Sequence, residues 1–237
     1  MRAMNREFVL CDTLDAVTRM SSELIQRLCA EAILERGSAS LAISGGSTPQ
    51  ALFKLWQAET FPGLASVQVF MSDERLVPTA SNDSNHGTML RLWPDVSCGQ
   101  LFLPDMAQSE QSIASHYEAQ LVGVLGELPS FDCVMLGLGE DGHTASLFRG
   151  KPSLTDTNLI CLADHGALPP PVKRLTFTYP LINNARNVVV IATGAKKRPW
   201  IEALLAGNND TSTFPLSGVN PHGKLWIVLD RAAWPEA

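Results

Sequence analysis

Apolar side chains recur every three or four residues between positions 12 and 36, which predicts a long amphipathic helix. The recurring positions are Val17, Met20, Leu24, Leu28 and Ala32. Gly37 is suited to end this helix. A second helix is expected to begin at Thr48-Pro49, where a hydroxyl can cap the first turn and proline fits it. Similar patterns predict helices over residues 108–125 and 194–205.

Short, almost continuous apolar segments lie between these helices and predict buried strands. They cover residues 39–43, 67–71, 101–103, 131–136, 159–162, 174–178, 188–192 and 225–229. Strands alternating with helices indicate an α/β fold with a doubly wound, mostly parallel, Rossmann-like sheet flanked by helices. There is no internal repeat and no convincing linker, and Pro169-Pro170-Pro171 suits a stiff surface loop. We therefore expect a single domain over residues 1–237.

Four unusual loops directly follow predicted strands, at residues 44–48, 72–75, 137–143 and 193–197. In an open sheet of this kind, ligands bind in the crevice at the carboxyl ends of the strands. We therefore expect the four loops to bring separate chemical groups, far apart in the chain, into one crevice.

The first of these loops has the composition of an anion site. It consists of Ser44, Gly45, Gly46, Ser47 and Thr48. Glycines let backbone N–H groups approach an anion, hydroxyls add donors, and the N-terminus of the following helix favours negative charge. A tight strand-to-helix turn with an N-cap would use the same residues, so that alternative stays open. The loop is not a Walker motif, because no Gly-Lys-Ser/Thr follows at the required spacing.

The third loop matches G-x-G-x-x-G over residues 137–142, a pattern that also occurs in dinucleotide-binding proteins. Two observations argue against a dinucleotide. Glu140 and Asp141 would place carboxylates where a pyrophosphate sits, and the apolar segment after them is too short for a crossover helix. We favour a turn that exposes Asp141 and His143 together, with an imidazole able to take a proton from water. The alternative is a histidine that only caps a short helix over residues 144–148.

Cationic side chains follow two of the strands. Arg75 ends the charged triplet at residues 73–75, which by default is a solvated loop, yet its place at the crevice suits a guanidinium that binds an anion. Lys196 and Lys197 are a second source of positive charge, or else the solvated first turn of a helix. Residues 84–87 offer polar contacts or cap the next helix. No metal-ligand spacing is present, so we expect no metal site.

Composition limits the possible partners. The 237-residue chain has a net charge of −6, which argues against a nucleic-acid binder but lets a few local cations hold one phosphate. The five cysteines are scattered without a C-x-x-C, which indicates reduced thiols and a cytoplasmic protein. Residues 1–10 lack the apolar stretch of a signal peptide, and no apolar run is long enough to span a membrane.

Several of these segments together resemble the 6-phosphogluconolactonase family, within the glucosamine/galactosamine-6-phosphate isomerase superfamily. They are SGGSTP at 44–49, DERLVP at 73–78, SNHG at 84–87, GLGEDGHTASLF at 137–148, RLT at 174–176 and TGAKK at 193–197. The resemblance implies a sheet of the sugar-phosphate isomerase type. It also implies hydrolysis, without metal or cofactor, of 6-phosphogluconolactone to 6-phosphogluconate in the pentose phosphate pathway. Arg149 departs from the family, which commonly has proline there.

The resemblance also implies a role for individual residues. His143 would be the catalytic base, Asp141 would orient its imidazole, and Arg75 would contact the substrate. The phosphate would bind the loop at residues 44–48, with Arg174 and Lys197 as partners. The sequence does not choose between these cations, and it leaves monomer and dimer open. Residues 207–223 match no pattern that we can interpret.

Two other functions use some of the same residues. Glucosamine-6-phosphate deaminases share the anion loop and an Asp-Gly-His. They follow the histidine with Phe-Asn-Glu, whose glutamate partners it, whereas this chain has Ser146-Leu147-Phe148 and so lacks the acidic partner. They also carry tyrosine in place of Arg75. A non-catalytic sugar-phosphate sensor of a transcription regulator would need a DNA-binding module. The residues before the first predicted strand form one helix without a basic recognition segment. Both comparisons favour the lactonase.

Overall fold

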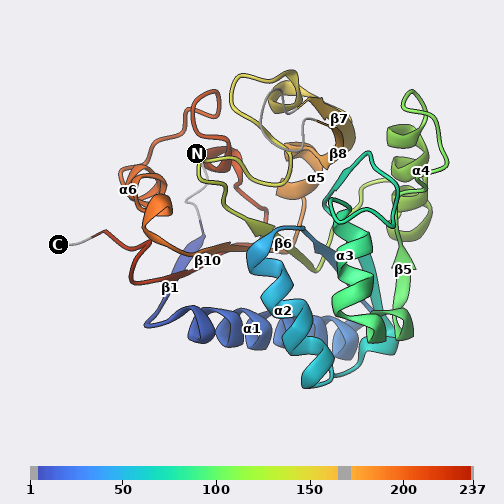
Figure 1. Cartoon of the computed structure of the whole chain (residues 1–237), viewed down its shortest axis with the longest axis horizontal. Helices are drawn as coiled ribbons and strands as arrows, with labels where there is room; N and C mark the ends of the chain where they lie inside the picture. Colours follow the sequence, from blue (N-terminus) through green and yellow to red (C-terminus); the bar gives the residue numbers. More distant parts are fainter. Residues whose placement is uncertain (1–4, 165–171, 236–237) are drawn as a thin grey trace.

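A computed structural model describes residues 5–164 and 172–235 of the chain. Its main sheet has seven strands in the order β1-β10-β9-β6-β2-β3-β5, and every neighbouring pair is parallel (Figure 1). Their bounds are β1 Arg6–Cys11, β2 Ala39–Ile43, β3 Val67–Met71, β5 Gln100–Phe102, β6 Cys133–Gly137, β9 Asn187–Ala192 and β10 Lys224–Asp230. The predicted doubly wound α/β fold is confirmed.

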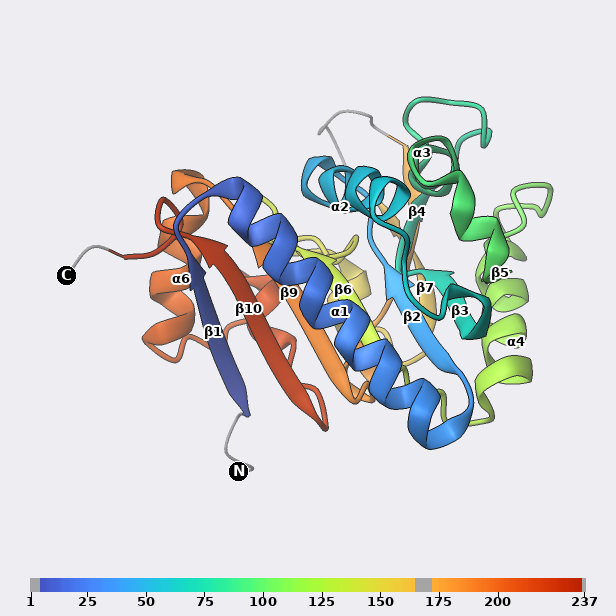
Figure 2. The ribbon, with the colours of Figure 1, turned by 90° about the horizontal axis from the view of Figure 1, so that it is seen from below.

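Helices cover both faces of this sheet. On one face lie α1 (Leu14–Arg36), α2 (Ser47–Ala58) and α3 (Asn85–Leu92), and Figure 2 shows α1 running across the strands. On the other lie α4 (Ile113–Leu125), α5 (Tyr179–Asn183) and α6 (Arg198–Leu205). Each face has its own buried apolar cluster, which explains why the strands are apolar on both sides. Short 3₁₀ helices are η1 Leu64–Ser66, η2 Pro94–Cys98, η3 Pro152–Thr155, η4 Ala195–Lys197 and η5 Pro215–Gly218.

Helix α1 begins and ends where its local chemistry allows. The Thr13 hydroxyl accepts a hydrogen bond from the Ala16 N–H at 3.1 Å, which caps the first turn. At the other end, Gly37 adopts a left-handed φ of 81° and its N–H donates to the Ile33 carbonyl, as glycine does at helix C-termini. The predicted apolar face is buried except for Met20, which is 39% exposed.

A second, antiparallel sheet contradicts the expected loop at residues 73–75. Its strands are β4 (Asp73–Arg75), β8 (Lys173–Phe177) and β7 (Ile160–Asp164), and the last two were expected in the main sheet. The charged triplet is not solvated, because Glu74 is completely buried and its carboxylate accepts the backbone N–H groups of Asn85 and His86, each at 2.7 Å. Burial of this charge is tolerated because the carboxylate is fully hydrogen-bonded.

Other boundaries also differ from the prediction. Helix α2 begins at Ser47 with Gly46 at its N-cap position, and no side chain caps it, so the expected Thr48 cap is wrong. Helix α4 begins at Ile113, five residues after the predicted start at 108. Residues 144–148 form turns in place of a short helix, and β1 was not predicted.

Two expectations concern the rest of the chain. The proline loop at 169–171 lies outside the described residues. Among helices in the described ranges, none is long and apolar enough to cross a membrane.

Candidate active site

The four loops that follow β2, β3, β6 and β9 meet around one cavity of about 270 Å³ at the carboxyl ends of these strands. The cavity is lined by Ser44, Gly45, Gly46, Ser47, Thr48, Pro49, Asp73, Arg75, Asn85, Gly137, Leu138, Gly139, Glu140, His143, Ala145, Arg174, Ile191, Thr193 and Lys197. Every predicted site residue except Asp141 is in this lining. The expected meeting of distant loops is thus observed.

The loop between β2 and α2 forms one wall of the cavity. Gly46 has a φ of 110°, and the absence of a side-chain cap leaves the first N–H groups of α2 available at the wall. The Ser44 hydroxyl, however, donates to the Met135 carbonyl at 3.1 Å and lies 2.6 Å from the Ser72 hydroxyl. Its side chain therefore fixes the loop to β6 and β3, and anion binding falls mainly to the backbone N–H groups.

Two arginines reach the cavity from the small antiparallel sheet. Arg75 on β4 is the direct cross-strand partner of Arg174 on β8. Arg75 Nη1 donates to the Asp83 carbonyl at 2.9 Å, and the Arg174 guanidinium lies 5.4 Å from the centre of the Phe148 ring. Burial lowers the pKa of Arg174, and the charge of Asp73 opposes this. Like charges placed opposite each other are unfavourable, so an anion between the two guanidinium groups would relieve the repulsion.

Asp73 places a buried carboxyl group in the same lining. The Ser146 hydroxyl donates to Oδ2 of Asp73 at 2.8 Å, whereas Oδ1 has no hydrogen-bond partner among the described residues. Burial raises the pKa of Asp73, and the Ser146 hydrogen bond and the charges of Arg174 and Arg75 oppose the rise. Ser146 thus contacts Asp73, whereas Phe148, which stands where the deaminases have the glutamate of Phe-Asn-Glu, packs against the His143 ring with ring centres 4.8 Å apart.

The turn after β6 places His143 against Asp141. Nδ1 of His143 is hydrogen-bonded to Oδ1 of Asp141. Burial alone would raise the pKa of Asp141, but the hydrogen bond and charge of His143 outweigh it and lower this pKa to about 2. Since Asp141 is then a carboxylate, Nδ1 carries the shared proton and Nε2 is the basic nitrogen of the ring. The turn is closed by the Gly139 N–H, which donates to the His143 carbonyl at 2.8 Å.

The two neighbouring lysines face different surroundings. Lys196 donates to the Glu140 carboxylate at 2.8 Å, and both side chains are more than 60% exposed. Lys197 lies in the cavity lining, and burial lowers its pKa although Glu140 and Asp141 oppose this. Both oxygens of the Asp230 carboxylate accept the Gly194 N–H and so fix the start of this segment. The geometry thus favours Lys197 over Lys196 as a ligand contact.

Sequence reasoning left some lining residues without a role. Asn85 packs against the anion loop, where a Cβ on Gly45 would overlap its amide, and its Nδ2 donates to the Asp73 carbonyl. Ser84 caps α3, so residues 84–87 combine the two roles between which the sequence could not choose. Thr193 directly follows β9, and this position at the carboxyl end of a strand is the signal that could have identified it as a lining residue. Within residues 5–164 and 172–235, no group of three or more His, Cys, Asp or Glu side chains is arranged to hold a metal ion.

Comparisons with known proteins agree with this geometry. Residues 12–227 match the family described as glucosamine-6-phosphate isomerases/6-phosphogluconolactonase. A curated protein named 6-phosphogluconolactonase from Synechocystis is 36% identical over 212 residues, covering 86% of each chain. A probable 6-phosphogluconolactonase from Drosophila melanogaster is 34% identical, covering 90% of this chain and 88% of the relative. The solved 6-phosphogluconolactonase from Trypanosoma brucei superposes with a TM-score of 0.88 at 26% identity, covering 98% of both chains.

Proposed function

Because the chain belongs to the glucosamine-6-phosphate isomerase/6-phosphogluconolactonase family, we propose that it hydrolyses 6-phospho-D-glucono-1,5-lactone to 6-phospho-D-gluconate, the lactonase step of the oxidative pentose phosphate pathway. The observation that carries this proposal is the shared cavity. Its lining combines an imidazole, a helix N-terminus with free N–H groups, and three cations at Arg75, Arg174 and Lys197. These are the groups that a phosphorylated lactone and its hydrolysis require.

The phosphate is expected to bind between the N-terminus of α2 and the cations. Backbone N–H groups at residues 46–48 would contact its oxygens, and Arg174 and Lys197 would supply positive charge from the opposite wall. With Arg75, the lining carries three cations against the carboxyl groups of Asp73 and Glu140, although the whole chain has a net charge of −6. Binding the phosphate at this end orients the lactone ring, so that its carbonyl carbon lies near His143.

The chemical step would use His143 as a general base. Nε2 takes a proton from a water molecule as the water oxygen attacks the lactone carbonyl, and Asp141 stabilises the imidazolium that forms. Arg75 or backbone N–H groups stabilise the oxyanion of the tetrahedral intermediate. When the intermediate collapses, the bond to the ring oxygen breaks and the imidazolium returns its proton to that oxygen. No covalent enzyme intermediate and no cofactor are needed.

The decisive experiment follows hydrolysis of freshly generated 6-phosphogluconolactone above its spontaneous rate. We expect the wild-type protein to accelerate it and His143→Ala to lose about 10²–10⁴-fold of kcat, the usual contribution of a general base. Unphosphorylated gluconolactone should be a much weaker substrate, because the anion site is then unused. Equal rates for the wild type and His143→Ala would contradict the proposed base.

A control assay separates the lactonase from its deaminase relatives. The wild-type protein is expected to release no ammonia from glucosamine 6-phosphate, because Phe148 stands where the deaminases have their glutamate and supplies no acidic group to His143. Ammonia release at a rate comparable to lactone opening would replace the proposed activity with deamination.

Location in the cytoplasm is also part of the proposal. It is supported by the five cysteines, all of which are free thiols in the structure. Fractionation of cells that make the protein would test it, and recovery from an organelle would contradict it.

A further inference from the structure

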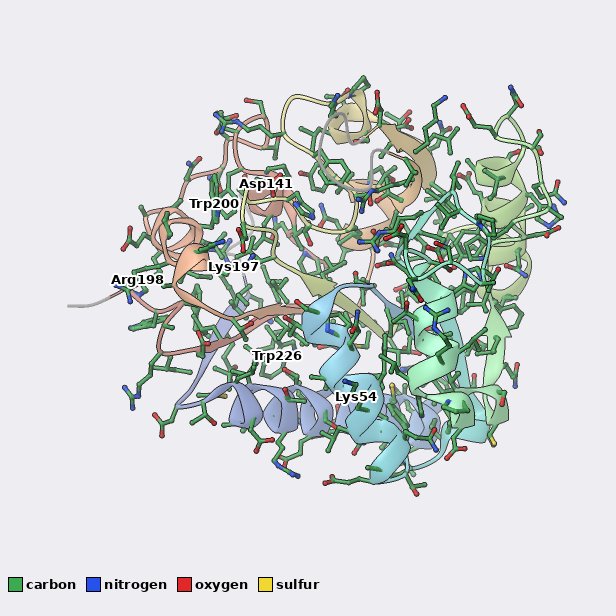
Figure 3. The ribbon with its side chains drawn as sticks, in the orientation of Figure 1. Lys54, Asp141, Lys197, Arg198, Trp200 and Trp226 are labelled. Atoms are coloured by element: carbon green, nitrogen blue, oxygen red, sulfur yellow. The ribbon has the colours of Figure 1, made fainter. Side chains whose placement is uncertain are left out.

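A helix and a loop that the sequence left without a role lie directly behind the Asp141–His143 turn. Figure 3 shows Trp200 of α6 beside Asp141 and Lys197. The Trp200 Nε1–H donates to the Glu140 carbonyl at 2.9 Å. The indole stacks on Phe214, with ring centres 5.1 Å apart and planes 25° apart. Phe214 is completely buried, so the stacked pair is anchored in the core.

The same pair limits the backbone on the other side of Asp141. Gly142 has a φ of 85°, and a Cβ there would lie 3.0 Å from the Trp200 ring and 3.1 Å from Phe214. The Gly142 carbonyl accepts the Leu216 N–H at 3.2 Å. The peptide group before Asp141 and the peptide group before His143 are therefore both hydrogen-bonded to this support, the first through Trp200 and the second through Leu216.

We propose that Trp200 is a positioning residue for the lactonase site, holding the 139–143 turn so that Asp141 and His143 stay in register with the bound phosphate. Trp200 is three residues after Lys197, at the start of the same helical segment. One side chain thus links the cation that faces the cavity to the turn that carries the base. This proposal rests on the proposed function, and it assigns a role to residues 207–223 through Phe214 and Leu216.

The expected kinetic effect is on kcat. A displacement of about 1 Å in a reacting group can cost about 100-fold in rate, so Trp200→Ala is expected to lower kcat by about 100-fold. Trp200→Phe keeps a ring against Phe214 and loses only the N–H donor, which is expected to cost about fivefold. Affinity for the product 6-phosphogluconate should change by less than about threefold in Trp200→Phe, because the retained ring contact with Phe214 keeps the segment of Lys197 in place and the anion loop and the arginines lie on other elements.

A matched control is available at Trp226 on β10. Its Nε1–H is likewise hydrogen-bonded, donating to Asn187 Oδ1 at 3.2 Å, and its ring lies against Lys224 on the α1 side of the sheet (Figure 3). Trp226→Phe therefore removes the same donor and keeps a ring, away from the cavity. We expect the kcat of Trp226→Phe to stay within about twofold of the wild type. Thermal unfolding of every variant shows whether it is folded.

A second readout does not depend on activity. In protein labelled with ¹⁵N-histidine, the ring signals of His143, assigned with His143→Ala, report the hydrogen bond from Nδ1 to Asp141. We expect these signals to shift or broaden in Trp200→Ala and Trp200→Phe and to stay unchanged in Trp226→Phe. If a folded Trp200→Phe keeps both the wild-type kcat and the wild-type His143 signals, the positioning role is refuted. If the wild type itself fails to hydrolyse the lactone, the proposed function fails, and the His143 signals alone still decide whether Trp200 holds the turn.

Discussion

Adding one methyl group at Gly139 should displace the His143 imidazole without replacing any residue to which a chemical role is assigned. A Cβ at this position would lie well inside 3.0 Å of Nδ1 and Cε1 of His143, closer than real Cβ atoms come to other atoms. Ordinary contact begins at 3.4 Å, so the imidazole must move by about 1 Å or more. A displacement of this size predicts that Gly139→Ala loses about 100-fold in kcat for 6-phosphogluconolactone.

The same change should cost little stability. Gly139 has no positive φ, so alanine adds no backbone strain. The His143 side chain is 27% exposed and can rotate outward, which breaks only its partly exposed hydrogen bond to Asp141, worth about 0–1 kcal/mol. For a chain of this size, that corresponds to a decrease in Tm of no more than about 2–4 °C.

The assay combines lactone hydrolysis with thermal unfolding of the same preparations. Gly123→Ala serves as the control, because its Cβ on α4 would meet nothing within 4 Å, and it should keep wild-type activity and a Tm at or above that of the wild type. Wild-type kcat in folded Gly139→Ala would refute the link between the position of His143 and catalysis. A large loss of Tm would refute the idea that the ring moves out freely.

Three further changes test other parts of the site and fold. Asp141→Asn should have a lower unfolding free energy than the wild type at neutral pH, and this difference should vanish as the pH falls from 4 to 2. A carboxyl whose pKa is lowered to about 2 stabilises the fold only while it is ionised, and unfolding experiments at a series of pH values measure the difference. Gly45→Ala overlaps Asn85 and should raise KM for the phosphorylated lactone about tenfold, equal to about 1.4 kcal/mol of binding, in steady-state assays. Asp132→Ala removes a buried carboxylate that accepts hydrogen bonds from the N–H and the hydroxyl of Ser40. Urea titration should show an unfolding free energy lower by about 3 kcal/mol, and kcat should be unchanged.

The sequence predicted most of the main sheet because its strands are buried on both faces and leave continuous apolar segments. The predicted strands at residues 39–43 and 67–71 have the same bounds as β2 and β3. The convergence of the loops that follow them could be predicted from the fold class. β4 could not be predicted, because the partners that allow Glu74 to be buried are backbone N–H groups eleven and twelve positions later in the chain. Local pattern carries no information about such partners.

The support behind His143 was missed for the same reason. Trp200 and Phe214 meet the 139–143 turn across about sixty to seventy positions of sequence, and neither belongs to a recognisable motif. β1 was missed because it is an edge strand whose burial is incomplete along most of its length. Edge strands leave a weaker apolar signal than central ones.

The pairing of the first strand with the last has a consequence for how the protein is made. Among the strands of the described residues, β1 pairs with β10 alone, and their registered residues run from Arg6 with Leu225 to Cys11 with Asp230. A ribosome therefore releases the N-terminal strand more than two hundred residues before its partner exists. Nascent chains are expected to keep this segment unpaired until β10 has been made, so the main sheet acquires its β1 edge only after all of its other strands exist.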